Sequence, residues 1–313
     1  MDVQIPETPR NVIERLRLEH SPDGHSKVSS IIKNALEIMV FSEHTDVNFD
    51  RRISTELYDT STHFLLEFLQ NADDNDYDPA VVPRLQFTYA SGFLRVDCNE
   101  VGFNASNVEA ICNIRSSTKS GQDHVGRTGE KGIGFKSVFK VADVVWIRSG
   151  EFAFKFDKAR PFGIIAPVWE EFPQSVLENH TSFLLQLNDR CDKVELITTL
   201  LNLDQTCLLF TRRLRHITVR VTQDNQTETK EMRRRVETDA NGQITVLDVG
   251  DQVFTYIITR RQVENLPHEP KRLGLKTSEL VLAFPALEDA TNATWRIQNV
   301  HNVLPIGKYG LKV

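Results

Sequence analysis

The chain has little of what marks secreted, disulfide-stabilised or membrane-spanning proteins. Its 313 residues include only four cysteines, which are widely scattered and lack the paired spacing of a disulfide frame or a zinc site. No apolar run approaches the ~20 residues of a membrane span, and the first residues lack the basic and apolar regions of a signal peptide. We therefore expect an intracellular protein, cytoplasmic or nuclear, without a membrane partner.

The sequence also lacks an excess of positive charge. It has 37 Lys and Arg against 43 Asp and Glu, a net charge of −6. The pI of about 5.9 argues against a dedicated nucleic-acid binder. Two basic clusters, 212–216 and 233–235, contain no aromatic residues that could stack on bases. We interpret both clusters as solvated faces and do not expect a nucleic-acid partner.

What is present is an apolar content of 40%, enough for one large or two ordinary domains. The residue patterns divide the chain into an N-terminal helical extension (1–45), a central section (46–190) and a second α/β unit (191–313). Helices are predicted at 11–19, 28–41 and 194–203, and strands at 85–89, 93–96, 144–148, 151–156, 181–187, 217–221, 244–249 and 254–259.

The segment 65–75 places three polar side chains on one stripe of an apolar helix. Glu67 and Asn71 are four residues apart and Asn71 and Asp74 are three apart, so all three project from one face. An unpaired buried polar group costs about 1–3 kcal/mol, so such a stripe suggests a function. One chemistry fits: Glu67 would activate a water, Asn71 would hold a metal ion, and Asp74 would lie further along the ligand. The alternative is a helix end that turns polar as it leaves the core.

Glycine-punctuated segments follow this helix. The acidic segment 97–100 lies just past a predicted strand, and Gly102 after it lets backbone come close to a ligand. The segment 116–129 is polar and contains three glycines, which is typical of a mobile flap. The segment 130–141 reads as a glycine loop that opens a helix, and free amide groups at a helix start form a phosphate site.

The glycine loop alone is a weak signal. It mimics a P-loop, but Phe135 separates Gly134 from Lys136 and no buried strand precedes it. The order of the segments is more specific: acidic–amide helix, strand-end carboxylate with glycine, polar flap, glycine loop.

In this order the chain resembles the GHKL superfamily of ATPases, which covers the ninety-kilodalton heat-shock chaperones, gyrase B, MutL and histidine kinases. It resembles most closely the branch of sacsin and the NO VEIN-like plant proteins. Four motifs carry the resemblance, within roughly residues 55–190: Leu-Gln-Asn-Ala-Asp-Asp-Asn (69–75), Asn-Glu-Val-Gly-Phe (99–103), Ser-Thr-Lys (117–119) and Lys-Gly-Ile-Gly-Phe-Lys-Ser-Val-Phe (131–139).

The resemblance implies an ATP site. By position, Glu67 corresponds to the general base that activates the attacking water, and Asn71 corresponds to the ligand of Mg²⁺. Asp74 corresponds to a residue lining the nucleotide pocket. Glu100 stands where most of the superfamily has the aspartate that accepts the adenine amino group, and it reaches one methylene further. The other positions assigned to nucleotide binding are Gly102, Lys119, Lys131, Gly132, Ile133, Gly134, Phe135, Lys136 and Thr181.

The resemblance also implies a fold. We expect an α+β protein: a two-layer α/β sandwich of the Bergerat ATP-binding type, with a mixed, mostly antiparallel sheet and helices on one face. A smaller transducer-like α/β unit would follow, and we expect it to be incomplete because 303–313 resembles an interior strand of the sacsin-like pattern. Four basic residues are candidates to contact the terminal phosphate from this unit: Arg212, Arg213, Lys276 and Lys308.

Together these inferences predict a chaperone-like module that binds ATP and hydrolyses it slowly, with Mg²⁺, as the flap closes. The partners implied are ATP and ADP, protein clients or partner domains, and a second copy in ATP-dependent dimerisation. A nucleotide-binding switch without turnover and an interaction scaffold within a larger protein are the alternatives. A histidine kinase fits less well, because no helical phosphoacceptor-histidine segment precedes the central section. For Lys119, Lys131 and Lys136, a place in a solvated flap is an equal alternative to phosphate contact.

Overall fold

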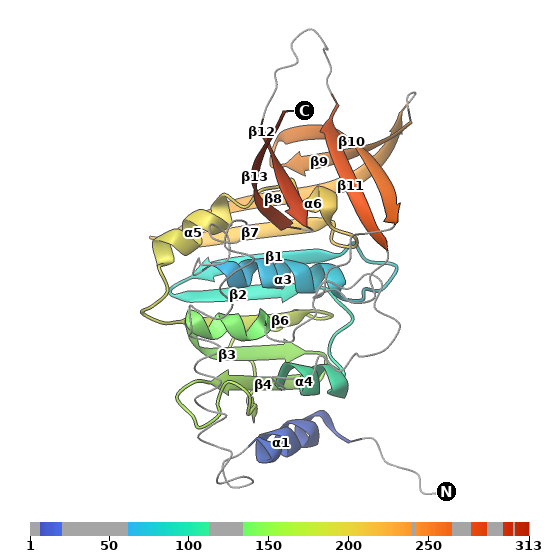
Figure 1. Cartoon of the computed structure of the whole chain (residues 1–313). Helices are drawn as coiled ribbons and strands as arrows, with labels where there is room; N and C mark the ends of the chain where they lie inside the picture. Colours follow the sequence, from blue (N-terminus) through green and yellow to red (C-terminus); the bar gives the residue numbers. More distant parts are fainter. Residues whose placement is uncertain are drawn as a thin grey trace, which may run out of the picture. The chain divides into compact units, whose positions relative to one another are not determined.

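The computed structural model describes residues 7–20, 62–112, 134–239, 242–264, 277–286, 297–302 and 304–312 (Figure 1). The chain forms two compact units. The first is made of Met1–Leu203 and Arg212–Lys230, and the second of Asp204–Thr211 and Glu231–Val313. The predicted flap 116–129 and the predicted helix 28–41 lie outside the described residues.

The first unit is built on a sheet with the strand order β7-β1-β2-β6-β3-β4-β5. All neighbours pair antiparallel except β1 and β7, which run parallel. The β1–β2 hairpin turns through Ser91 (φ 50°) and Gly92 (φ 79°), which supply the positive φ values that a tight two-residue turn requires. The strands are β1 (Arg84–Ala90), β2 (Phe93–Cys98), β3 (Ala142–Ser149), β4 (Phe152–Asp157), β5 (Val168–Trp169), β6 (Thr181–Leu187) and β7 (His216–Gln223).

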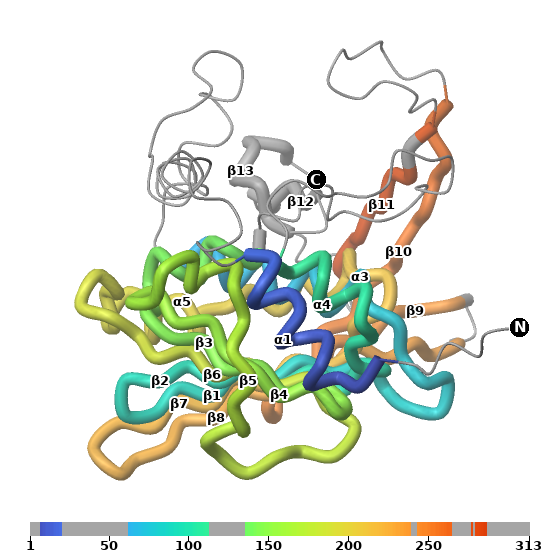
Figure 2. Tube along the Cα trace, turned by 90° about the horizontal axis from the view of Figure 1, so that it is seen from below, coloured from blue at the N-terminus to red at the C-terminus, as the bar shows by residue number. Residues whose placement is uncertain are grey.

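Figure 1 shows β1, β2, β6 and β3 side by side, and Figure 2, seen from below, shows α3 and α4 on one side of these strands. Helix α3 buries Leu65, Phe68, Leu69 and Ala72, and the Phe68 ring meets Phe183 of β6 with 5.1 Å between centroids. The helical elements among the described residues of this unit are α1 (Pro9–Glu19), α3 (His63–Asp74), α4 (Ala105–Cys112), the 3₁₀ helix η2 (Gly134–Lys140) and α5 (Lys193–Leu201).

The second unit consists mainly of strands. Its described sheet has the order β11-β10-β9-β8 with antiparallel pairing, and β12 and β13 form a separate antiparallel pair. The elements are α6 (Cys207–Phe210), β8 (Gln226–Asp239, which begins in the first unit), β9 (Gly242–Val249), β10 (Gln252–Glu264), β11 (Thr277–Pro285), β12 (Ile297–Asn302) and β13 (Leu304–Lys312).

The expectation of a two-layer Bergerat-type sandwich followed by a smaller α/β unit is wrong. The described strands join in one mixed sheet of eleven strands, from β11 through β8 and β7 to β5. The reason lies after residue 216, where strand patterns continue through elements as long as β8 (14 residues) and β10 (13 residues). These strands extend the sheet instead of forming a second unit covered by helices.

The structure confirms the predicted strands and the helices at 11–19 and 194–203 to within a few residues. One local prediction needs correction: the predicted helix after the glycine loop is a 3₁₀ helix, η2. The first compact unit continues past residue 190 and includes β7, which pairs with β1. A domain boundary at residue 190 stays a prediction. Among the described residues, no helix has the length and apolar character needed to cross a bilayer.

Candidate functional site

The proposed general base, Glu67, lies half-buried on α3 with 24% of its side chain exposed. Burial raises the pKa of its carboxyl group, which moves the group toward the range where a base works near neutral pH. His63, one turn earlier, lies 3.9 Å from Glu67, and burial followed by the charge of Lys140 lowers the pKa of its imidazole. The imidazole is therefore mostly neutral at pH 7, and Glu67 does not depend on an ion pair with it.

Asn71 follows Glu67 by one helical turn and is exposed. An amide oxygen with a carboxylate on the same helix face fits Mg²⁺, which takes one or two protein oxygens and fills its other positions with phosphates and waters. Asn71 and Glu67 are thus the residues that could hold such an ion. Among the residues described, no cluster of three His, Cys, Asp or Glu side chains forms a closed metal site.

Glu100 lies just past the end of β2 and is 7% exposed. The Thr181 hydroxyl on β6 donates a hydrogen bond of 2.5 Å to its carboxylate. Thr181 is 2.6 Å from the hydroxyl of Ser149 on β3, and Ser149 accepts the backbone N–H of Phe103 at 2.7 Å. The structure therefore brings two predicted site residues, Glu100 and Thr181, into direct contact. It adds Ser149, which the sequence motifs did not indicate.

The pKa of Glu100 is raised because the carboxyl group is buried. The hydrogen bond from Thr181 acts in the opposite direction, and the nearby charge of Asp76 raises the pKa further. A carboxylate can accept about four hydrogen bonds, so the bond from Thr181 leaves capacity for an N–H group of a ligand.

Gly102 gives the turn after Glu100 its shape. Its φ of +91° lies in the region that residues with a side chain rarely adopt. A Cβ at this position would lie 3.4 Å from the Ser149 hydroxyl and 3.6 Å from the backbone nitrogen of Gly150. Both are ordinary van der Waals distances, so glycine is favoured here by its positive φ rather than by a lack of space.

The segment after α3 joins the helix to this turn. The Tyr77 hydroxyl donates to the carbonyl of Ala72 at 2.5 Å and lies 3.1 Å from the sulfur of Cys98. The backbone N–H of Val101 donates to the carbonyl of Asp76 at 3.0 Å. These contacts connect the C-terminal end of α3 with the Glu100 turn. The acidic–amide helix and the strand-end carboxylate therefore lie in one region.

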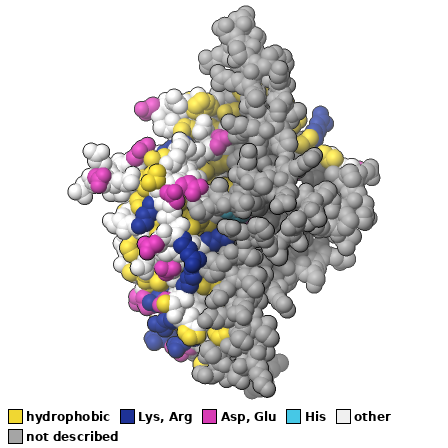
Figure 3. Space-filling view, turned by 60° about the vertical axis from the view of Figure 1, so that its left-hand side comes forward, with side chains coloured by type: hydrophobic (Ala, Val, Ile, Leu, Met, Phe, Trp, Pro, Cys, Tyr) yellow, Lys and Arg dark blue, Asp and Glu magenta, His cyan; other side chains and the backbone are white. Residues whose placement is uncertain are grey.

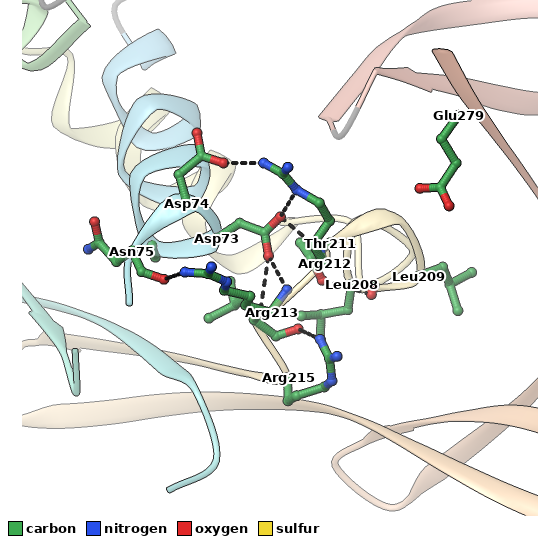
Figure 4. A network of polar contacts seen from close by, with 12 residues as sticks. Asp73, Asp74, Asn75, Leu208, Leu209, Thr211, Arg212, Arg213, Arg215 and Glu279 are labelled. Atoms are coloured by element: carbon green, nitrogen blue, oxygen red, sulfur yellow. Dashed lines mark hydrogen bonds and ion pairs between the residues drawn. The ribbon is translucent and has the colours of Figure 1, made fainter. Parts of the chain in front are cut away.

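The most buried carboxylate of α3 is Asp73, which the spacing argument missed (Figure 4). It is 1% exposed and accepts the backbone N–H groups of Arg212, Arg213 and Leu214 at 2.8, 2.8 and 2.9 Å. Successive N–H groups that converge in this way form a natural anion-binding concavity. One signal in the sequence could have located it: Asp73 follows Leu69 by four residues and so continues the buried stripe of the helix.

Asp74 and Asp76 pair with arginines from the same segment. Arg212 forms an ion pair with Asp74, and Arg213 donates to the carbonyl of Asn75 (Figure 4). Arg213 also forms an ion pair with Asp76. The two arginines predicted as candidates for phosphate contact therefore bind the end of α3 in this state. Of the other two candidates, Lys276 lies outside the described residues, and Lys308 lies on β13, where only the backbone is described.

Of the glycine loop, only its end is described. Gly134 begins η2, whereas Lys119, Lys131, Gly132 and Ile133 lie outside the described residues. Phe135 is in the core, with ring centroids 6.0 Å from Phe156 and 5.8 Å from Phe183. Lys136 is also buried: its ammonium lies 4.3 Å from the Phe156 ring centroid and donates to the carbonyl of Ile164. Burial lowers the pKa of Lys136 to about 8.

The basic cluster 233–235 is only partly a solvated face. Arg233 and Arg235 are exposed and pair with Glu231 and Asp248, each at 2.8 Å. Arg234 is 7% exposed and donates to the carbonyls of Leu209 and Thr211. On the face drawn in Figure 3, basic and acidic side chains of the described residues are interspersed. This distribution does not provide a continuous basic surface there for a nucleic-acid backbone.

No protein-family model matches the chain. The chain is 34% identical over 285 residues to Protein NO VEIN of Arabidopsis thaliana, an alignment that covers 83% of the chain and 10% of that protein. The chain therefore spans about a tenth of the length of the curated relative it matches. The predicted similarity to NO VEIN is confirmed, whereas membership of the GHKL superfamily stays a prediction.

Proposed function

We propose that the first unit binds ATP and hydrolyses it slowly, as a conformational module within a larger protein. The observation that carries the proposal is the carboxylate of Glu100, buried at a strand end, held by Thr181 and bordered by the glycine turn. A carboxylate is a pure hydrogen-bond acceptor, so it suits a ligand that presents an amino group, as adenine does.

The side chains of α3 support a hydrolytic step in the same region. Glu67 would take a proton from the water that attacks the terminal phosphorus, and ADP would leave with the charge of the broken bond. Its half-burial and raised pKa suit that role. Asn71 would hold Mg²⁺, which supplies positive charge to the phosphate oxygens as negative charge develops on them.

Hydrolysis of ATP with Mg²⁺, measured at steady state for the wild-type chain and for Glu67→Ala, tests the proposal. Loss of the general base is expected to lower kcat by about 10²–10⁴-fold. ATP affinity, measured by calorimetry, should change by less than about threefold, because Glu67 acts in the transition state rather than in ground-state binding.

Glu14→Ala provides the matched control. Glu14 is an exposed helical glutamate of α1 that pairs only with Arg10 among the contacts of its side chain described here, and its loss should leave kcat unchanged. If both the wild type and Glu67→Ala bind ATP but neither hydrolyses it, the chain is a nucleotide-dependent switch and not an ATPase. An absence of binding would refute both readings and favour a scaffold.

A further inference from the structure

A chain of hydrogen bonds leads to Glu100 across three neighbouring strands of the first unit. The backbone N–H of Phe103 donates to the Ser149 hydroxyl at 2.7 Å, the hydroxyl oxygens of Ser149 and Thr181 lie 2.6 Å apart, and Thr181 donates to Glu100 at 2.5 Å. Ser149 on β3 is the cross-strand neighbour of Thr181 on β6, and Thr181 is that of Cys98 at the end of β2. The sheet therefore fixes the two hydroxyl groups, and both residues are fully buried.

The direction of each bond follows from the number of protons. A hydroxyl group has one proton to donate and two lone pairs that accept. The proton of Thr181 is directed at Glu100, so the bond between the two hydroxyl groups uses the proton of Ser149. The oxygen of Ser149 in turn accepts the N–H of Phe103. All three bonds thus point toward the carboxylate, and bonds aligned in this way strengthen one another.

The opposite direction of the chain is unfavourable. A protonated Glu100 would donate to Thr181, and Thr181 would then donate to Ser149. The proton of Ser149 would lose its acceptor, because none of its described contacts offers another one. A buried donor without a partner is costly, so Ser149 favours the state in which Glu100 is ionised and only accepts hydrogen bonds.

We propose that Ser149 is a positioning residue that sets the nucleotide preference of the candidate site by keeping Glu100 a pure acceptor. The inference rests on the proposed function, which places a purine base at Glu100. The amino group of ATP can donate to an ionised Glu100. In the same pose, the carbonyl group that ITP carries at this ring position would face the carboxylate acceptor to acceptor. A buried polar group left without a partner in this way discriminates strongly between ligands.

The chain of hydrogen bonds acts against the other influences on Glu100. Burial and the charge of Asp76 raise the pKa of Glu100, and the bond from Thr181 lowers it. Tyr77 and Cys98 also lie close, but burial raises the pKa of the Tyr77 hydroxyl far above its usual range and that of the Cys98 thiol to about 12. Both groups are therefore neutral between pH 5 and 8, where Glu100 can titrate.

Affinities for ATP and ITP with Mg²⁺, measured by calorimetry from pH 5 to 8 on the full chain, test the inference. The wild type is expected to prefer ATP. In Ser149→Ala, the ratio of the two affinities should fall by about two- to tenfold, the contribution of one hydrogen bond. The decline of this ratio at low pH should also begin at a higher pH, because Glu100 is protonated more readily. A packing defect alone would weaken both nucleotides equally at every pH.

Ser182→Ala is the matched control. Ser182 follows Thr181 on β6, is equally buried, and donates at 2.5 Å to a different carboxylate, that of Asp97. Alternation along the strand places its side chain on the other face of the sheet, so its loss should leave the ratio unchanged. Ser149→Thr keeps a hydroxyl group and should keep the preference. If Ser149→Ala does not fold, Ser149→Cys replaces it, since a thiol is a weak donor and the ratio should again fall.

The role of Ser149 is refuted if the wild type binds ATP and ITP equally well. It is also refuted if Ser149→Ala keeps both the ratio and the pH profile of the wild type. A wild-type chain that binds neither nucleotide gives a different result, because it refutes the proposed function itself.

Discussion

The clearest consequence at the scale of single residues is the pH dependence that Lys136 imposes on stability. Its pKa is about 8 in the folded chain and 10.5 when unperturbed, because the ammonium is buried among aromatic rings. Between these values unfolding takes up a proton, so the free energy of unfolding rises with pH. Below pH 8 the lysine is charged in both states, and the full penalty of about 3 kcal/mol is present.

The substitution Lys136→Met is therefore expected to raise the free energy of unfolding at pH 7 by about 1–2 kcal/mol. It removes a buried charge but leaves the carbonyl of Ile164 without its donor. Urea denaturation at pH 7 to 10 checks this, with the gain shrinking as pH rises through 8. A pH-independent difference between the two chains would show that Lys136 is not the titrating group.

Alanine substitutions at two glycines with positive φ can distinguish the effect of backbone strain on stability from an effect on the candidate site. Gly92 has φ +79° and open space around its Cβ position, whereas the Cβ of an alanine at position 102 would meet Ser149. Gly92→Ala and Gly102→Ala should each lower the free energy of unfolding by about 1 kcal/mol through backbone strain. Only Gly102→Ala should also weaken ATP binding, measured by calorimetry. Equal binding by both variants would exclude the Gly102 turn from the site.

At the scale of elements, two polar residues of α3, Asp73 and Asn71, are expected to contribute very differently to stability. Asp73→Ala removes a buried acceptor that serves three backbone N–H groups, and it should lower the free energy of unfolding by about 3–5 kcal/mol. Asn71→Ala, on the exposed side of the same helix, should change it by less than about 0.5 kcal/mol. Thermal and urea denaturation measure both. Comparable losses in the two variants would contradict the network described around Asp73.

Local elements could be predicted from the sequence, but their partners could not. The β1–β2 hairpin was predicted because residue alternation and a Ser-Gly turn are short-range features. The parallel pairing of β1 with β7 was missed, since nothing in either strand specifies the other. The same distinction holds for the candidate site. Helical spacing was enough to predict that Glu67 and Asn71 share one face of a helix. The role of Asp73 could not be predicted in this way, because it depends on amide groups that lie far along the chain.

At the scale of the whole molecule, the extent of the first unit can be tested by shortening the chain. A chain ended at residue 190 loses β7, which covers the edge of β1, and also loses the donors to Asp73. A chain ended at residue 230 keeps both. The longer chain is expected to unfold cooperatively in a thermal scan followed by circular dichroism, and the shorter one to lose this transition or aggregate. A shorter chain with the same transition would support the boundary at 190.

The parallel pairing also has a consequence for synthesis on the ribosome. Strand β1 is complete when residue 90 has been made, but its partner on one side begins only at His216. At elongation rates of about 5–20 residues per second, the growing chain spends on the order of ten seconds with that edge uncovered. An uncovered strand edge invites pairing with other chains, so the nascent protein passes through an interval in which binding by a chaperone would favour correct folding.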